Sequence, residues 1–328
     1  IPYNSFNATQ VMAQLLQQKV KLRYADKPFT YNGINYNSGT LIVLKAGNTP
    51  EWKSLVMQAC KAFNVQPDAV ESGFVDKGAD FGSPYVRFIK PPRVALIAGT
   101  NISNTASGEV WNLFEQVLRY PITRIDAKYM DEISNDDFDV LIMPDGNYKT
   151  LSDKETKDAL ENFANRGGKI IALESAAVQI ASLDWGFKLR EIKKDSADSS
   201  NYSLLKKYAD RERDAIKEFN PGAIYRVELD NTHPLAYGYP NYYYTLKMDA
   251  NLYEFLKNGW NVGVVKKSSY QAGFTGSKLK SEIKDALLFG VQPHGDGNII
   301  LLADDVLFRL FWQNGKQLFC NAVFLVGQ

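Results

Sequence analysis

The chain has 328 residues, of which 45% are hydrophobic, and its 38 basic and 37 acidic side chains leave a net charge close to zero. This length is enough for two domains with hydrophobic cores. The balanced charge argues against nucleic acid as a partner, and no run approaches the roughly 18 apolar residues of a membrane span. The composition is therefore that of a globular protein without a membrane-spanning segment.

Cysteine and histidine are scarce, with two of each in the chain. Cys60 and Cys320 lie far apart in apolar stretches, in no metal or redox spacing, so we predict two small buried side chains. A catalytic zinc site needs three protein ligands, and neither His233 nor His294 begins a His-x-x-Glu pair. The sequence thus predicts no metal site and no cofactor, and a turn role for His233.

The first 91 residues predict a small α/β domain. A helix is expected over 8–18, followed by a hairpin whose Asn32-Gly33 pair suits a type I′ turn, a buried strand over 40–44 and a helix over 50–65. Residues 71–92 are rich in glycine and turn formers and end in Pro91-Pro92. We place a domain boundary there and assign 92–328 to a second domain.

From Arg93 onward, continuous apolar runs alternate with amphipathic segments. This rhythm predicts a doubly wound α/β fold with a mostly parallel, flavodoxin-like sheet covered on both faces. A charged and Tyr-rich segment at about 185–285 interrupts the alternation. No G-x-G-x-x-G follows the first strand, which disfavours a dinucleotide site. The expected elements are strands over 93–99, 122–127, 138–146, 169–174 and 297–303, and helices over 107–120, 152–167 and 317–327.

The segment "KIIALESAAVQIA" predicts a buried strand, a sharp turn and a helix. Class I glutamine amidotransferases carry G-x-C-x-G at such a junction, and here the nucleophile position holds Glu174 followed by Ser175, with alanine at both glycine positions. One interpretation is a catalytic carboxylate or hydroxyl. The other, which we favour, is that Glu174 or Ser175 caps the following helix.

The segment "GVQPHGDG", residues 290–297, offers a base and an orienting carboxylate. His294 and Asp296 resemble the matching pair of the amidotransferases and would form a triad with Ser175 as the nucleophile. The flanking glycines equally predict a tight hairpin in which His294 is merely solvated.

Several segments, in the same order over almost the whole chain, resemble the C-terminal region of bacterial zinc carboxypeptidases of the carboxypeptidase A-like family. They include "YNGINYNSGTLIV", "SGFVDKGADFGSPYVR", "FDVLIMPDG", "AIYRVELDNTHPLAYGYP" and "FRLFWQNGKQLFCNAVFL". The resemblance implies a class I glutamine amidotransferase-like domain with a degenerate site, exported to the periplasm or secreted. It also implies that zinc and the catalytic residues belong to a peptidase domain outside this chain.

Three functions remain open. The favoured one is a non-catalytic accessory region that packs on a linked or co-folded peptidase domain. The second is a module that binds a small ligand or peptide in the crevice at the carboxyl ends of the strands. The third is a residual amide or ester hydrolase that uses Ser175 or Glu174 with His294. The crevice residues expected for the second function are Thr100, Asn101, Asp145, Asn147, Glu174 and Ser175.

The tyrosines of 237–247 leave two interpretations as well. They can form an aromatic platform for a carbohydrate or a peptide. Alternation along a half-buried strand explains the same pattern.

Overall fold

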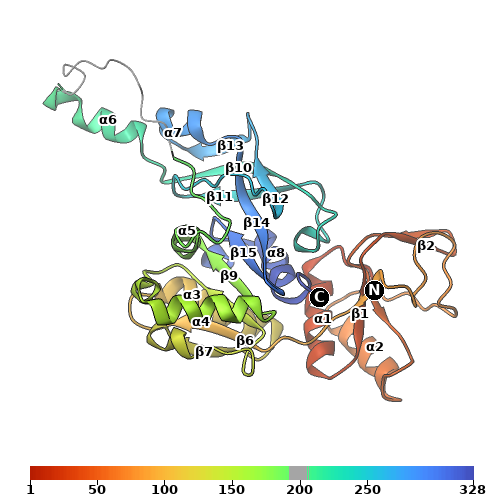
Figure 1. Ribbon diagram of the computed structural model, residues 1–328. Helices are drawn as coiled ribbons and strands as arrows, with labels where there is room; N and C mark the ends of the chain where they lie inside the picture. Colours follow the sequence, from red (N-terminus) through yellow and green to blue (C-terminus); the bar gives the residue numbers. More distant parts are fainter. Residues whose placement is uncertain (192–204, 206) are drawn as a thin grey trace.

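The computed structural model describes residues 1–191, 205 and 207–328 (Figure 1). A ten-stranded sheet forms the centre of the molecule, with nine strands in the order β11-β10-β12-β14-β15-β9-β8-β6-β7 and β13 paired to β10. One half of this sheet is parallel and the other is antiparallel, and they meet at β15. A smaller unit from the first 91 residues packs beside it.

The parallel half confirms the predicted doubly wound fold. Its strands are β6 (Val94–Ala98), β7 (Thr123–Asp126), β8 (Val140–Met143), β9 (Lys169–Leu173) and β15 (Gly297–Leu302). Nearly every residue of β6, β8 and β9 is buried, as continuous apolar strands predict.

Helices cover both faces of the parallel half. A Cβ added to Gly168 would lie 2.4 Å from the ring of Phe163 in α4 (Lys154–Asn165), so residue 168 faces α4. The next side chain, Lys169, points the other way and donates to the carbonyl of Val326, 2.8 Å away, just past α8 (Gln313–Phe324). The other helical segments of this half are α3 (Asn104–Asn112), η1 (Leu113–Leu118), η2 (Ala127–Glu132), η3 (Lys149–Ser152), α5 (Glu174–Ala181) and η7 (Phe308–Leu310).

The charged and Tyr-rich segment supplies most of the antiparallel half. Tyr243 is buried in β11 whereas Tyr242 and Tyr244 are exposed, so the tyrosines alternate as a half-buried strand predicts. The expected segment also covers residues 192–204 and 206, which lie outside the described residues. The elements of this half are η5 (Tyr208–Asp210), α6 (Arg211–Lys217), β10 (Gly222–Leu229), η6 (Pro234–Ala236), β11 (Tyr242–Lys247), β12 (Trp260–Val265), β13 (Tyr270–Phe274), α7 (Ser277–Glu282) and β14 (Ala286–His294).

The N-terminal unit combines two helices with two small sheets. A three-stranded sheet has the order β4-β1-β5, and β2 and β3 form a hairpin. Asn32 and Gly33 at its tip have φ values of 49° and 76°, so the predicted type I′ turn is consistent with the structure. The elements are α1 (Phe6–Gln17), β1 (Leu22–Ala25), β2 (Phe29–Tyr31), β3 (Ile34–Tyr36), β4 (Leu41–Val43), α2 (Trp52–Ala62) and β5 (Val86–Phe88).

One hydrophobic core runs from the N-terminal unit into the large sheet. Helix α1 packs against α8, and the buried hydroxyl of Tyr3 donates to Asn321 Oδ1 at 2.8 Å. Cys60 and Cys320 are both buried and unpaired within this core, which confirms their predicted role as small buried side chains.

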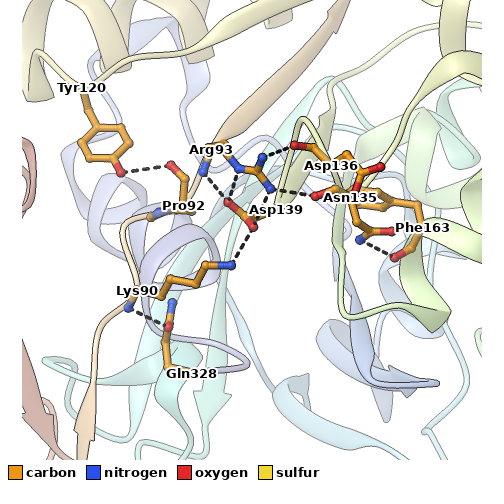
Figure 2. A network of polar contacts seen from close by, with 9 residues as sticks. All are labelled: Lys90, Pro92, Arg93, Tyr120, Asn135, Asp136, Asp139, Phe163 and Gln328. Carbon is orange, nitrogen blue, oxygen red and sulfur yellow. Dashed lines mark hydrogen bonds and ion pairs between the residues drawn. The ribbon is translucent and has the colours of Figure 1, made fainter.

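Polar contacts attach the chain around the predicted boundary at Pro91-Pro92 to the large sheet (Figure 2). Lys90 and Arg93, on either side of the prolines, both bind the carboxylate of Asp139 just before β8, at 2.9 and 3.0 Å. Tyr120 donates its buried hydroxyl to the carbonyl of Pro92 at 3.0 Å. Burial of Asp139 favours a raised pKa, but the bonds from Arg93 and Lys90 outweigh it and hold the pKa well below its usual range. The connector is therefore fixed to the large sheet.

Candidate functional site

The junction after β9 has the strand-turn-helix geometry that the sequence predicts. Strand β9 ends at Leu173, α5 begins at Glu174, and Glu174 has a left-handed backbone with φ of 48°. A non-glycine residue in this conformation costs on the order of 1–3 kcal/mol. The fully buried Ala172 and Ala176 stand where the amidotransferase motif has glycine. Glu174 therefore occupies the position of a nucleophile at a sharp turn.

Ser175 joins this strand-turn-helix junction, which we call the elbow, to the loop after β8 and does not cap the helix. Its hydroxyl accepts from the amide of Gly146 at 2.9 Å and donates to the carboxylate of Asp145. The N-cap residue of α5 is Leu173, and no side chain caps the helix. The favoured capping interpretation of Glu174 and Ser175 is therefore wrong.

The structure does not assemble the triad of Ser175, His294 and Asp296. His294 ends β14 and Asp296 lies in the turn to β15, and Asn298 just beyond that turn pairs with Lys169 at the start of β9. Ser175 follows the opposite end of the same strand, and the four steps from Lys169 to Leu173 alone span about 13 Å at 3.3 Å per residue. The hairpin interpretation of "PHGDG" agrees with the observed turn.

Neither histidine serves the elbow. His294 lies 3.8 Å from Glu161 and beside the ring of Trp185. His233 accepts from the amide of Leu235 at 3.1 Å in the turn before η6, which is the turn role expected of it. Burial lowers the pKa of His233 to about 4, so its ring is neutral. No histidine base is within reach of Glu174 or Ser175.

Within the crevice expected at the carboxyl ends of the strands, backbone hydrogen bonds join the loops after β6 and β8. The amide of Ser103 donates to the carbonyl of Asp145 at 2.9 Å, and the amide of Asn147 donates to Asn101 at 2.8 Å. A Cβ on Gly146 would lie 2.9 Å from Ile102. The strands β7 and β8 lie on opposite sides of β6, so the strand order reverses between β6 and β8. Open α/β sheets usually bind their ligands at such a reversal.

A pocket of about 280 Å³ opens beside Glu174, and we call it the acidic pocket. It lies where the carboxyl ends of β8, β9 and β15 meet the segment after β11. Five of its lining residues carry a carboxyl group. The full lining is Asp145, Glu174, Ser175, Leu246, Met248, Asp249, Asn251, Ala303, Asp304, Asp305 and Phe308.

Half of the expected crevice residues lie outside the acidic pocket. Thr100, Asn101 and Asn147 are exposed on these two loops and line no part of that pocket. Only three of the six expected residues, Asp145, Glu174 and Ser175, are brought together.

Two unpredicted residues of the acidic pocket could have been found from the sequence. Asp304 and Asp305 directly follow the buried run of β15, just as Asp145 and Glu174 follow β8 and β9. The same rule, polar residues past the end of a parallel strand, finds them. Asp249 comes from the antiparallel half, and no local pattern places it here.

Glu174 is the unpaired carboxyl group of the acidic pocket. Within the described part of the chain its carboxyl forms no hydrogen bond or ion pair. Burial, together with the neighbouring Asp305 and Asp145, raises the pKa of Glu174 to about 9. The side chain is therefore a neutral carboxylic acid at neutral pH, which can donate one hydrogen bond but is a poor nucleophile.

A buried lysine neutralises one wall of the pocket. Lys247 donates to Asp304 at 3.0 Å and to Asp249 at 2.6 Å, and Thr245 donates to the other oxygen of Asp304 at 2.6 Å. Burial, the largest effect, lowers the pKa of Lys247, but the two aspartates together outweigh it and hold the pKa above its usual value. Lys247 is thus charged, and its ammonium group binds both aspartates of this wall.

A second carboxyl pair, formed by Glu109 and the pocket residue Asp305, lies beside the acidic pocket. Glu109 of α3 accepts from the amide of Arg309 at 2.8 Å, and Asp305 accepts from the amide of Leu307 at 2.8 Å. Burial and, to a lesser extent, the nearby Asp305 raise the pKa of Glu109 to about 7. Burial also raises the pKa of Asp305. In the described ranges, no three His, Cys, Asp or Glu side chains are placed so that they could hold a metal ion.

Comparison with known proteins shows similarity to solved structures. No family model and no curated protein matches the chain. A glutamine amidotransferase from Thermotoga maritima shares 10% identity over 71% of this chain and 97% of its own, with a TM-score of 0.44. A protein described as ThuA-like from Bacteroides uniformis shares 15% over 70% and 89%, with a TM-score of 0.42.

A third similar structure comes from Thermoplasma acidophilum and is described as a GMP synthase component. It shares 11% identity over 70% of this chain and 92% of its own, with a TM-score of 0.44. These likenesses concern the arrangement of helices and strands and say nothing of activity. In the residues that the structure describes, no helix is long and apolar enough to cross a membrane. The chain has a mixed α/β fold with a large central sheet.

Proposed function

We propose that the chain is a non-catalytic module whose acidic pocket binds a small ligand with ammonium or several hydroxyl groups. One observation carries this proposal: the residue at the nucleophile position is Glu174, an unpaired and neutral carboxyl group among four aspartates. The site has no histidine base, so acyl transfer lacks its proton acceptor. The same groups accept hydrogen bonds from ammonium or hydroxyl donors.

The charge of the pocket determines how such a ligand binds. A cation near Glu174 favours the ionised carboxylate, so binding lowers its pKa and releases a proton. Affinity for a permanently charged ligand should therefore rise with pH as Glu174 ionises towards pH 9. A neutral polyol has no such dependence.

Isothermal titration calorimetry with choline, spermidine and glucose tests the proposal. Choline keeps its charge at every pH, so we expect tighter binding at pH 8.5 than at pH 6.0, with proton release seen as a buffer-dependent enthalpy. Glu174→Gln should abolish the pH dependence, and Asp249→Asn should weaken binding at least fivefold. Glu161→Gln, outside the pocket, is the matched control. Absence of saturable binding of all three probes up to 10 mM would refute the proposal.

An accessory role beside a zinc peptidase domain is the second candidate. It is supported by an exposed strip of apolar side chains on the edge strand β11 and just past it, where Tyr242, Tyr244 and Met248 are 36, 38 and 49% exposed. Contiguous exposed apolar groups are typical of protein contacts. The expectation of a peptidase partner, of zinc in that partner and of export rests on the sequence resemblance alone.

Surface plasmon resonance tests the accessory role with an immobilised carboxypeptidase A-like zinc peptidase domain of the resembled family. We expect saturable binding by the chain and at least tenfold weaker binding by Tyr244→Ser/Met248→Ser. Phe74→Ser, a 79% exposed residue elsewhere, is the control. Equal binding of both variants, or none at 100 µM, would exclude a role for this strip.

A further inference from the structure

A row of alternate side chains on β11 leads away from the acidic pocket. Tyr242 and Tyr244 are exposed on this strand, and each is followed by a buried residue. Successive side chains of a strand point to opposite faces, so the two exposed tyrosines share one face of β11. Leu246 and Met248 continue the same alternation, and both line the acidic pocket. We call Tyr242, Tyr244, Leu246 and Met248 the β11 track.

The β11 track extends the binding surface beyond the acidic pocket. The pocket has a volume of about 280 Å³, which is near the lower limit for sites that take small molecules. It can therefore enclose a unit of about one ring, and a longer ligand must continue on the surface outside it. At about 3.4 Å per residue, the track covers about 20 Å from Met248 at the pocket to Tyr242.

An arginine without a polar partner flanks the two tyrosines. Arg226 of β10 pairs with Tyr244 in the antiparallel register, and its guanidinium lies 4.9 Å from the centre of the Tyr242 ring. Within the described ranges, this guanidinium forms no ion pair and its N–H groups donate no hydrogen bond. These N–H groups can donate to the oxygens of a ligand that lies on the tyrosines. The positive charge of Arg226 disfavours an ammonium group at the same place.

These groups together match the surface of a sugar. The face of a tyrosine ring is negative, and the C–H groups on the face of a sugar ring are weakly positive, so the two faces attract each other. Carboxyl groups in the pocket accept hydrogen bonds from hydroxyl groups, and the guanidinium of Arg226 donates to them. A polyamine fits the acidic pocket but meets the charge of Arg226 on the β11 track.

We propose that the acidic pocket and the β11 track together bind an extended, neutral oligosaccharide. Its terminal unit occupies the pocket, and the following units lie on Tyr244 and Tyr242. This inference rests on the proposed function of the pocket, and it selects hydroxyl groups rather than ammonium as the groups bound there. It also assigns the exposed tyrosines of β11 to a ligand rather than to a peptidase domain.

Isothermal titration calorimetry with glucose and cellotetraose, its extended β-1,4-linked tetramer, tests this inference. We expect a Kd for cellotetraose at least tenfold below that for glucose. Tyr242→Ser/Tyr244→Ser should remove this gain and leave glucose binding unchanged, because glucose occupies the pocket alone. Asp249→Asn should weaken the binding of both sugars. Tyr129→Ser, at a 46% exposed tyrosine outside the β11 track, is the matched control, and circular dichroism confirms that each variant folds.

Four results would overturn the inference. They are no saturable binding of cellotetraose, equal affinity for glucose and cellotetraose, full cellotetraose binding by the double tyrosine variant, and full cellotetraose binding by Asp249→Asn. The proposed function of the pocket fails on a different result, because it requires that choline, spermidine and glucose all fail to bind. Binding of choline without binding of cellotetraose would therefore reject the oligosaccharide and retain the pocket as a ligand site.

Discussion

Lys247 forms an ion pair of 3.0 Å with Asp304 in which the lysine is 0% and the aspartate 2% exposed. The lysine ends β11 and the aspartate follows β15, so the pair joins the antiparallel half of the sheet to the end of the parallel half. Taking both charges out of water is costly, and each charge depends on the other. This pair supports the wall of the acidic pocket.

Replacement of Lys247 should destabilise the fold strongly. Lys247→Met leaves Asp304 buried without its counter-charge, which typically costs about 3–5 kcal/mol of unfolding free energy. Urea denaturation followed by circular dichroism measures it. The exposed pair of Lys266 and Glu228 at 2.8 Å is the control, and Lys266→Met should cost less than about 1 kcal/mol. Similar losses for both variants would contradict the role assigned to Lys247.

Glu174→Gln should stabilise the protein at alkaline pH. The pKa of Glu174 is raised to about 9 from 4.5, so between these values the unfolded chain gives up a proton that the native state retains. The native state therefore loses stability as pH rises from 4.5 to 9. Because Glu174 is partly exposed, we expect a gain for the variant of about 1–3 kcal/mol at pH 8.

The comparison of pH values separates this effect from simple repacking. At pH 4.5 both side chains are neutral, so the variant and the wild type should have similar midpoints of urea denaturation. A gain of the same size at both pH values would show that ionisation of Glu174 is not its cause.

Asp139→Asn should weaken the connector between the two parts of the chain. The pKa of Asp139 is lowered by the bonds from Arg93 and Lys90, although burial alone would raise it. Its contribution is therefore present above the unfolded value of 3.8 and is lost as pH falls through the lower native value. We expect a loss of about 1–3 kcal/mol at pH 7 that shrinks below pH 3.

Urea denaturation at pH 7 and pH 2.5 checks this dependence. Asp158→Asn, which breaks an exposed pair with Lys154, is the control and should change stability by less than about 1 kcal/mol. A loss for Asp139→Asn that is unchanged at pH 2.5 would contradict an ionic contribution.

The chain should be inactive as a hydrolase. Glu174 is neutral at pH 7, Ser175 bonds to Asp145 and Gly146, and His294 lies at the far end of β9. We expect no turnover of amide, ester and C-terminal peptide substrates by the wild type, Glu174→Ala, Ser175→Ala or His294→Ala. Chromogenic product release measures it. Activity that any of these substitutions removes would restore the elbow as a catalytic site.

The amino-acid sequence by itself determined the parallel half of the sheet and the elbow. Strands buried on both faces are near-continuous apolar runs, as β6, β8 and, after Lys169, β9 are. The Asn32-Gly33 turn follows from the positive φ values that such a turn requires. These features depend on neighbours in the chain, so local patterns predict them.

Only the tertiary structure decided which polar side chains meet. Strand β14 runs antiparallel to β15, which places His294 at the end of the sheet opposite to Ser175. The apolar residues of a strand do not reveal the direction in which it runs. Asp249 lines the same pocket as Glu174 because Lys247, the last residue of β11, binds both Asp249 and Asp304, which lies just past β15. Backbone bonds join two loops within the expected crevice at Asn101 and Asn147. Convergence of distant side chains depends on the packing of whole elements, and a linear pattern does not encode it.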